Sequence, residues 1–392
     1  MVHTPYYLFN ADEFIDNYNE LESTFRKYYS NYHIAYSFKT NYTPAVCKLI
    51  LELGGYAEVV SDMEYELAKR IGFSVDRIIY NGPGKEKYIN ECVILGGKLN
   101  IDNLSEVDKV CEIAKKKSRL SVGIRVNFDV GNNLHSRFGL DAFNGDFDKA
   151  IERLLDAGVL VNGIHFHISR ARGLDAWINR INSILEIADK VEIKTNNHLQ
   201  YIDLGSGMFG HLPDELSSQF TNIPSYDDYA RVVAGTMSDH YVDRIDKPIL
   251  FTEPGTTLVS KYFSIFSKVL DIKTIRNKNF ALLDCSFHNV GEICGLKKVP
   301  MKIVESGDKE EIYESVDLVG YTCLEQDVIY HDYHGSLGVG DIIEFSNVGG
   351  YSIVDKPPFI HPDIPIFMDI SGSRSLIKRA QTLDDIFAPY VF

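Results

Sequence analysis

Lys39 is the residue of this sequence with the clearest chemical potential. It follows an apolar, β-prone run at 34–38 and precedes the polar turn Thr40-Asn41. A lysine at the end of a buried strand must be solvated, paired or used, and a neutral amine in a partly desolvated site can form a Schiff base with a carbonyl cofactor. Taken alone, Lys39 is explained more simply by a side chain that reaches solvent or pairs with a carboxylate. The residues at the other predicted strand ends are needed to choose between these interpretations.

Eight strand-like segments alternate with helical patterns from about residue 30 to about residue 255. They are expected at 34–38, 56–60, 77–80, 98–101, 121–126, 161–167, 200–204 and 248–252. Short strands that are apolar on both faces and alternate with helices predict a parallel (β/α)8 TIM barrel, whose active face is formed by the C-terminal strand ends. The alternative is an open doubly wound sheet, which normally carries a glycine-rich turn after its first strand. That turn has no glycine here, so the barrel is favoured.

The predicted strand ends carry side chains that can do chemistry. In chain order they are Lys39, Ser61, Asn81, Asp102-Asn103, Arg125, His165 and His167, Gly205-Ser206-Gly207, and Glu253. Glycines in the seventh of these turns can present backbone N–H groups to a phosphate, which barrels of this kind often bind after strands seven and eight.

The pattern changes after residue 260. Segments with a period of two at 262–270, 280–283, 316–319 and 341–345 predict a second, C-terminal all-β domain. We predict a barrel over 29–258 and a β-domain made of 1–28 and 259–392, in which the N-terminal segment packs with the C-terminal strands.

Composition restricts the partners. The 392 residues carry a net charge of −15, which argues against nucleic acid and anionic membranes. No apolar run is long enough to span a bilayer, and the N-terminus does not resemble a secretion signal. Six cysteines without metal-ligand spacing indicate reduced thiols in a cytoplasmic protein and predict no metal site.

The motifs, taken in order, resemble those of the fold-type-III pyridoxal-phosphate-dependent decarboxylases. This group holds diaminopimelate, ornithine and arginine decarboxylases and is related to alanine racemase. The matching segments are 36–41 (YSFKTN), 60–64 (VSDME), 82–85 (GPGK), 101–103 (IDN), 163–167 (GIHFH), 203–207 (DLGSG), 252–255 (TEPG), Cys323 with Asp327, and 349–352 (GGYS). They cover nearly the whole chain.

The resemblance implies four catalytic residues. Lys39 holds pyridoxal 5'-phosphate as a Schiff base, and Glu253 keeps the pyridine nitrogen protonated, so that the ring stabilises the carbanion left by carbon dioxide. His167 stacks on the ring, although His165 points the same way in a strand. Cys323 reaches across a homodimer interface and handles the proton returned to Cα.

The resemblance also implies binding residues. Besides Lys39, His167 and Glu253, the cofactor is expected to contact Ser169, Gly205, Ser206, Gly207, Gly255, Thr256 and Tyr351. The small-molecule amino-acid substrate is expected to contact Arg125, Arg170, His288, Leu324 and Asp327.

Several departures from the family pattern bear on the substrate. Thr256 stands where the family has arginine, and Leu324 stands where it has an acidic residue. The segment 284–289 (DCSFHN) replaces an element of diaminopimelate decarboxylases and is closer to relatives in specialised pathways. We therefore expect a bulkier or modified amino acid, with Arg170 supplying the charge that Thr256 lacks. The alternatives are an amino-acid racemase or epimerase, diaminopimelate decarboxylase proper, and a non-catalytic protein that binds pyridoxal phosphate.

Overall fold

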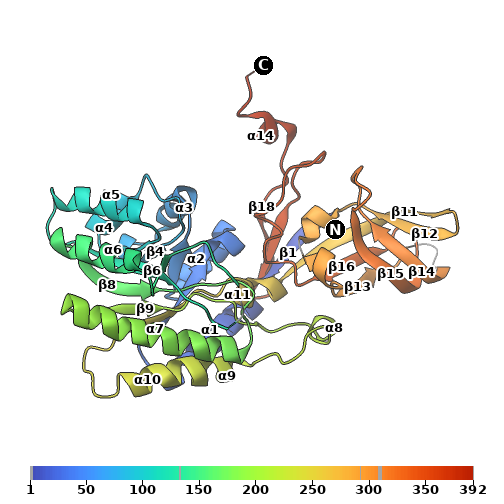
Figure 1. Cartoon of the computed structure of the whole chain (residues 1–392). Coiled ribbons are helices and arrows are strands. Elements are labelled where there is room, and N and C mark those ends of the chain that lie inside the picture. The colour runs from blue at the N-terminus through green and yellow to red at the C-terminus, as the bar shows by residue number, and fades with distance from the viewer. Residues whose placement is uncertain (1–2, 132–133, 292, 308–310, 392) are drawn as a thin grey trace. The chain divides into compact units, whose positions relative to one another are not determined.

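The chain forms two compact units in a computed structural model that describes residues 3–131, 134–291, 293–307 and 311–391 (Figure 1). One unit consists of residues 17–210 and 222–257, and the other of 1–16, 211–221 and 258–392. The first unit begins within the N-terminal helix, and Phe25 of that helix stacks on Tyr32 of the first barrel strand at 4.6 Å. The domain boundaries given above stay a prediction.

The first unit is the predicted parallel barrel, and its closure is confirmed by the strand pairing. Its strands are β2 (Tyr32–Ser37), β3 (Tyr56–Val59), β4 (Ile78–Tyr80), β5 (Lys98–Ile101), β6 (Ser121–Asn127), β8 (Leu160–His165), β9 (Tyr201–Asp203) and β10 (Ile249–Thr252). They pair in this order, and β10 pairs with β2 to close the ring. The two-residue strand β7 (Leu140–Asp141) pairs with the end of β6.

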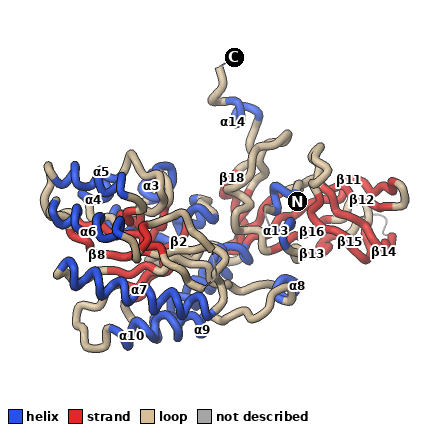
Figure 2. The backbone as a smooth tube through the Cα atoms, viewed as in Figure 1, coloured by secondary structure: helices blue, strands red, loops and turns tan. Residues whose placement is uncertain are grey.

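Helices surround these strands, as the blue and red segments of Figure 2 show. They are α1 (Ala11–Tyr28), α2 (Pro44–Glu52), α3 (Asp62–Ile71), α4 (Ile89–Ile94), α5 (Leu104–Ala114), α6 (Gly145–Asp156), α7 (Leu174–Thr195), α9 (Tyr226–Ala230), α10 (Thr236–His240) and α11 (Thr256–Val259). The backbone N–H of Glu64 donates to the Ser61 hydroxyl at the start of α3, which is the N-cap predicted from the sequence. The described residues include no helix that is long and apolar enough to cross a membrane.

The interior of the barrel is filled by Tyr201, which packs with Ala35, Ile79 and Phe251. Its ring needs a glycine beside it, because a Cβ atom on Gly163 would lie 2.0 Å from the Tyr201 Cζ. Tyr201 thereby forms the floor beneath the polar strand ends.

The second unit is mostly β, as expected. Its described residues form the strands β1 (Tyr6–Asn10), β11 (Phe263–Ile275), β12 (Lys278–Leu283), β13 (Met301–Glu305), β14 (Glu311–Val319), β15 (Val328–Leu337), β16 (Ile342–Ser346), β17 (Ile366–Ile370) and β18 (Ser373–Lys378). Short helices accompany them: α8 (Asp214–Ser217), α12 (Phe287–Val290), α13 (Ile293–Leu296) and α14 (Leu383–Phe387). Strand β1 lies between β11 and β17, so the N-terminal segment shares a sheet with the C-terminal strands.

Candidate active site

Lys39 is held against a buried carboxylate. It lies in a single 3₁₀ turn (Phe38–Thr40) directly after β2. Its Nζ donates to the Ser37 Oγ at 2.7 Å and to the Glu58 Oε2 at 2.8 Å. The Glu58 side chain is 1% exposed and that of Lys39 is 32% exposed. Lys39 is thus both paired and accessible, which a lysine that reacts with a carbonyl compound requires.

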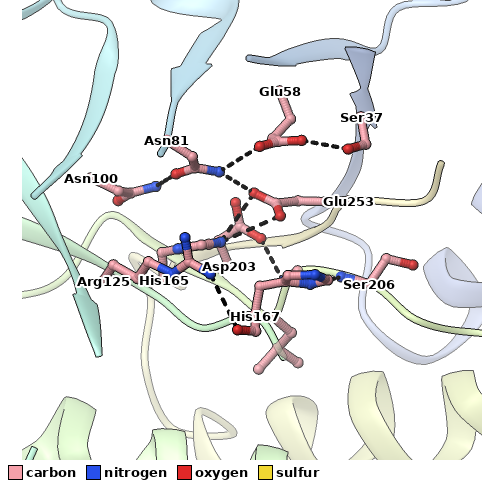
Figure 3. Close-up of polar contacts among 12 residues, drawn as sticks. Ser37, Glu58, Asn81, Asn100, Arg125, His165, His167, Asp203, Ser206 and Glu253 are labelled. Atoms are coloured by element: carbon pink, nitrogen blue, oxygen red, sulfur yellow. Dashed lines mark hydrogen bonds and ion pairs between the residues drawn. The ribbon is translucent and has the colours of Figure 1, made fainter. Parts of the chain in front are cut away.

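Asn81 joins this ion pair to a second carboxylate, as Figure 3 shows. Its Nδ2 donates to the Glu253 Oε1 at 2.6 Å and to the Glu58 Oε1 at 3.1 Å. The Asn81 Oδ1 accepts a hydrogen bond from Asn100 at 2.8 Å, and the Asn100 Oδ1 accepts one from the Tyr201 hydroxyl at 2.7 Å. A continuous chain of hydrogen bonds therefore runs from Lys39 to Glu253 and is anchored in the floor of the barrel.

Glu253 is a buried carboxylate that remains ionised. Burial alone would raise its pKa, but His165 and Lys39 outweigh burial and hold the pKa well below its usual range. The His165 Nε2 lies 3.2 Å from the Glu253 Oε1. Burial, with the adjacent charge of Glu253, raises the pKa of Asp203 well above its usual range. Of the two neighbouring carboxyl groups, Asp203 therefore holds the proton and Glu253 the negative charge.

The same three groups have a spacing that also suits a cation. Ligand atoms of His165, Asp203 and Glu253 all lie within 4.8 Å of one another. The sequence predicts no metal here, and the ionised Glu253 at the barrel centre equally suits a protonated ring nitrogen.

His167 lies just beyond β8, which ends at His165. Its Nδ1 accepts a hydrogen bond from the backbone N–H of Ser206 at 3.2 Å. Burial, aided by the charge on Lys39, lowers the pKa of His167 well below its usual value, so its ring is neutral. The two histidines thus have separate partners: His165 contacts Glu253, and His167 contacts the glycine turn. Stacking of His167 on a ring stays a prediction.

The turn Gly205-Ser206-Gly207 has the features of an oxyanion site. Gly205 has a φ of +59° and approaches His167 so closely that a Cβ atom would lie 2.7 Å from its ring, so only glycine fits. The Ser206 hydroxyl is buried and has no hydrogen-bond partner among the described residues. The buried Arg180 donates to the carbonyl oxygens of Leu204 and Ser206 at 3.0 and 3.1 Å. A buried hydroxyl group without a hydrogen-bond partner, next to a buried guanidinium group, suits the binding of a phosphate group.

The remaining barrel residues predicted from the sequence lie around this centre. Arg125 is buried, 3.5 Å from the Asp102 Oδ1, and donates to the backbone carbonyl of His167 at 3.3 Å. Ser169 and Arg170 follow His167 and are exposed. Gly255 packs against Thr40, since a Cβ atom there would lie 2.0 Å from the Thr40 Oγ1. Thr256 begins α11 and is half-buried.

Cys323 and its neighbours belong to the β unit. The Cys323 thiol is exposed and lies between β14 and β15. Asp327 is buried, and its two oxygens accept hydrogen bonds from the backbone N–H groups of Phe287 at 2.7 Å and Thr322 at 3.0 Å. Asp327 therefore shapes the Cys323 loop, and its predicted role as a substrate ligand stays a prediction.

Three more predicted residues lie in the same unit. The His288 ring lies 4.0 Å from that of Phe287, Leu324 is half-buried beside Cys323, and Tyr351 has a left-handed backbone with φ of +60°. Their proposed roles toward substrate and cofactor stay predictions.

Three site residues were absent from the sequence prediction: Glu58, Asn100 and Arg180. Asn81, His165 and Asp203 stood at predicted strand ends or in a quoted motif, but no role was predicted for Asn81 or Asp203. Glu58 left a usable signal, because it is a charged residue within the otherwise apolar strand β3. An internal charge in such a strand must have a partner, and the nearest candidate was Lys39.

A barrel that presents a lysine, an ionised carboxylate and a glycine turn at its C-terminal strand ends belongs to the class of pyridoxal-phosphate enzymes. The sequence profile of pyridoxal-dependent decarboxylases, covering their pyridoxal-binding domain, matches residues 15–260. The chain belongs to this family, and it is a decarboxylase that uses pyridoxal phosphate.

The known relatives span almost the whole chain. The diaminopimelate decarboxylase of Archaeoglobus fulgidus is 27% identical over 92% of this chain and 88% of its own. The L-glutamyl-(BtrI acyl-carrier protein) decarboxylase of Niallia circulans is 25% identical over 98% of this chain and 93% of its own. The crystal structure of diaminopimelate decarboxylase from M. jannaschii has a TM-score of 0.86 and 24% identity, covering 99% of this chain and 92% of that chain. The predicted closeness to specialised-metabolite relatives is not confirmed.

Proposed function

We propose that this enzyme removes carbon dioxide from an α-amino acid at the site built around Lys39 and Glu253. The observation that carries the assignment is the hydrogen-bonded chain from Lys39 through Glu58 and Asn81 to Glu253. It links the amine that would hold the cofactor to the carboxylate that would face its ring nitrogen.

Each residue has a task that follows from its setting. Bound pyridoxal phosphate supplies a ring that accepts the electrons left when carbon dioxide departs. The ionised Glu253 would keep a proton on the ring nitrogen of the bound group, and Glu58 orients the Lys39 amine. Neutral His167 offers an apolar ring face, and the Ser206 hydroxyl with the glycine turn binds the phosphate.

The first candidate for the substrate is a bulkier or modified amino acid of specialised metabolism, and the second candidate is diaminopimelate. Diaminopimelate is favoured because the similar proteins are named diaminopimelate decarboxylases. The first is supported by Thr256 and Leu324, which replace the charged residues expected of a diaminopimelate enzyme. Carbon dioxide release from meso-diaminopimelate separates them: turnover at a rate typical of enzymes, ~1–10³ s⁻¹, would establish the second candidate.

We also propose a cytoplasmic homodimer in which Cys323 completes the partner's site. The exposed thiol and the family resemblance support this arrangement. Sedimentation of a monomer at working concentration would contradict it.

The experiment for the Lys39 assignment is an absorption spectrum of purified protein with pyridoxal phosphate. We expect a visible band that is lost in Lys39→Ala and kept in Lys48→Ala, whose exposed lysine pairs with Glu52 on α2. A wild-type protein without the band, or a Lys39→Ala variant that keeps it, would refute the assignment.

A further inference from the structure

A buried arginine without a counter-ion lies against the turn Gly205-Ser206-Gly207. Arg180 belongs to α7 and is 0% exposed. Among the described residues, no carboxylate lies within ion-pair distance of its guanidinium group, and its Nε and Nη2 atoms have no hydrogen-bond partner. A buried charge that is neither paired nor fully hydrogen-bonded is costly for a folded protein. Arg180 therefore requires an explanation other than stability.

Arg180 keeps its positive charge at neutral pH. Burial lowers the pKa of its guanidinium group to about 9, which is still above neutrality. The guanidinium carbon lies 4.0 Å from the centroid of a Trp177 ring and 5.5 Å from that of the Phe166 ring. These rings hold the group in place by cation–π attraction but do not neutralise it. A full charge is thus held inside the barrel unit.

Peptide groups of the turn connect this charge to the open side of the site. The Arg180 Nη1 donates to the carbonyl oxygen of Ser206 at 3.1 Å. The N–H of Gly207 belongs to the same trans peptide group, so it points away from Arg180, and polarisation of the carbonyl makes it a stronger donor. Within the described parts of the chain, neither this N–H nor the Ser206 hydroxyl has a hydrogen-bond partner. Two free donors therefore lie next to each other in front of a buried cation.

The segment that lies along the turn brings no positive charge of its own. The N–H of Glu253 donates to the Gly205 carbonyl oxygen at 2.8 Å, and the Thr257 hydroxyl donates to that of Met208 at 2.9 Å. Residues 253–257 (EPGTT) thus accompany the turn, and Thr256 stands among them where the family has arginine. Arg180 is the cation that hydrogen bonds link to the turn.

We propose that Arg180 is a positioning residue for the cofactor phosphate and balances the phosphate charge through the Ser206–Gly207 peptide group. The Ser206 hydroxyl and the Gly207 N–H would contact the phosphate oxygens, whereas Arg180 acts on them from behind the turn. The missing counter-ion is thereby explained, because the buried cation is balanced when a phosphate occupies the turn. This inference rests on the proposed function, which assigns the turn to pyridoxal phosphate.

The first test compares Arg180→Met, which removes the charge, with Arg180→Lys, which keeps it. The full-length protein is freed of cofactor and titrated with pyridoxal phosphate and with pyridoxal, which lacks the phosphate. Arg180→Met should weaken pyridoxal phosphate binding roughly 30- to 100-fold, as for unit charges about 6–8 Å apart at an effective dielectric constant of about 20, and pyridoxal binding less than about twofold. Arg180→Lys should retain most of the preference for pyridoxal phosphate. Arg244→Met is the matched control and should change neither affinity, because Arg244 also donates to a backbone carbonyl oxygen, that of Leu199 at 3.1 Å, but lies at the N-terminal strand ends.

A second test is independent of any cofactor band. Inorganic phosphate should raise the unfolding temperature of the wild-type protein freed of cofactor, because a ligand that binds the folded state stabilises it, whereas chloride at the same ionic strength should not. The rise should be lost in Arg180→Met and kept in Arg180→Lys and Arg244→Met.

Three results would overturn the role of Arg180. They are the absence of a phosphate effect on the wild type, equal losses for pyridoxal phosphate and pyridoxal in Arg180→Met, and equal losses in the Met and Lys variants. The last result would assign the effect to the shape of the turn and not to the charge. If Arg180→Met does not fold, the phosphate effect on the wild type and the Lys variant decide. If phosphate stabilises the protein in an Arg180-dependent manner while pyridoxal phosphate gives no visible band, the role of Arg180 stands and the proposed function fails.

Discussion

Replacing Asn81 by alanine tests the hydrogen-bonded chain that joins the two halves of the site. The change removes the donor that bridges Glu58 and Glu253 at 3.1 and 2.6 Å. It also leaves the Asn100 amide group without an acceptor, because in the wild type this group donates to the Asn81 Oδ1 at 2.8 Å. All four side chains are buried. The loss therefore falls on groups that bulk water does not reach.

The expected magnitude follows from these contacts. A hydrogen bond to a charged group contributes about 1.5–3 kcal/mol, and a stranded buried donor costs about 1–3 kcal/mol. Two bonds and one stranded donor give an upper range of roughly 4–9 kcal/mol, and water that enters the vacated space offsets part of it. We expect the free energy of unfolding of the barrel unit to fall by about 3–5 kcal/mol.

The assay is urea denaturation followed by the fluorescence of the single tryptophan, Trp177, which is fully buried on α7 of the barrel unit. It therefore reports the unfolding of the unit that contains Asn81. Asn162→Ala is the control, because among the described residues the Asn162 amide group donates only to the side chain of Gln200, at an exposed position. That variant should stay within about 0.5 kcal/mol of the wild type. A loss below about 1 kcal/mol for Asn81→Ala would refute the network as a stabilising element.

Two further predictions concern the barrel wall. Gly163→Ala should destabilise the protein by about 1–3 kcal/mol, because its Cβ atom would overlap the Tyr201 ring. Gly145→Ala is the control and should leave the stability unchanged, because a Cβ atom there meets nothing within 4 Å. Equal effects of the two substitutions in urea denaturation would contradict this prediction. Burial raises the pKa of Glu64 to about 7, so the folded state binds its proton more tightly and stability is lost as pH rises from about 4.5 to 7. Relative to Glu64→Gln, the wild type should lose stability across this window, and parallel pH profiles of the two proteins would refute the reasoning.

The barrel and the principal residues of its site were predictable from the sequence. Alternating strands and helices limit the architecture to a few solutions, and a closed parallel barrel brings every C-terminal strand end to one face. Lys39, Glu253 and the turn 205–207 were recognisable for this reason, since each follows an expected strand. The β-unit was predicted less completely. Its edge strand β18 is largely exposed, and an exposed strand lacks the alternation of apolar and polar residues by which a half-buried strand is recognised.

The pairing of side chains was decided by the tertiary structure. Glu58 lies in β3, Asn81 directly follows β4 and Asn100 lies in β5, and their contact depends on which way each side chain points inside the closed ring. Sequence spacing carries no information about such contacts, because they are set by the register between strands. The same limit applies to Arg180, which reaches the turn 205–207 from helix α7. The sequence by itself determined which residues stand at the strand ends. The fold decided which of them form ion pairs and hydrogen bonds with one another, because only the closed barrel sets the distances between them.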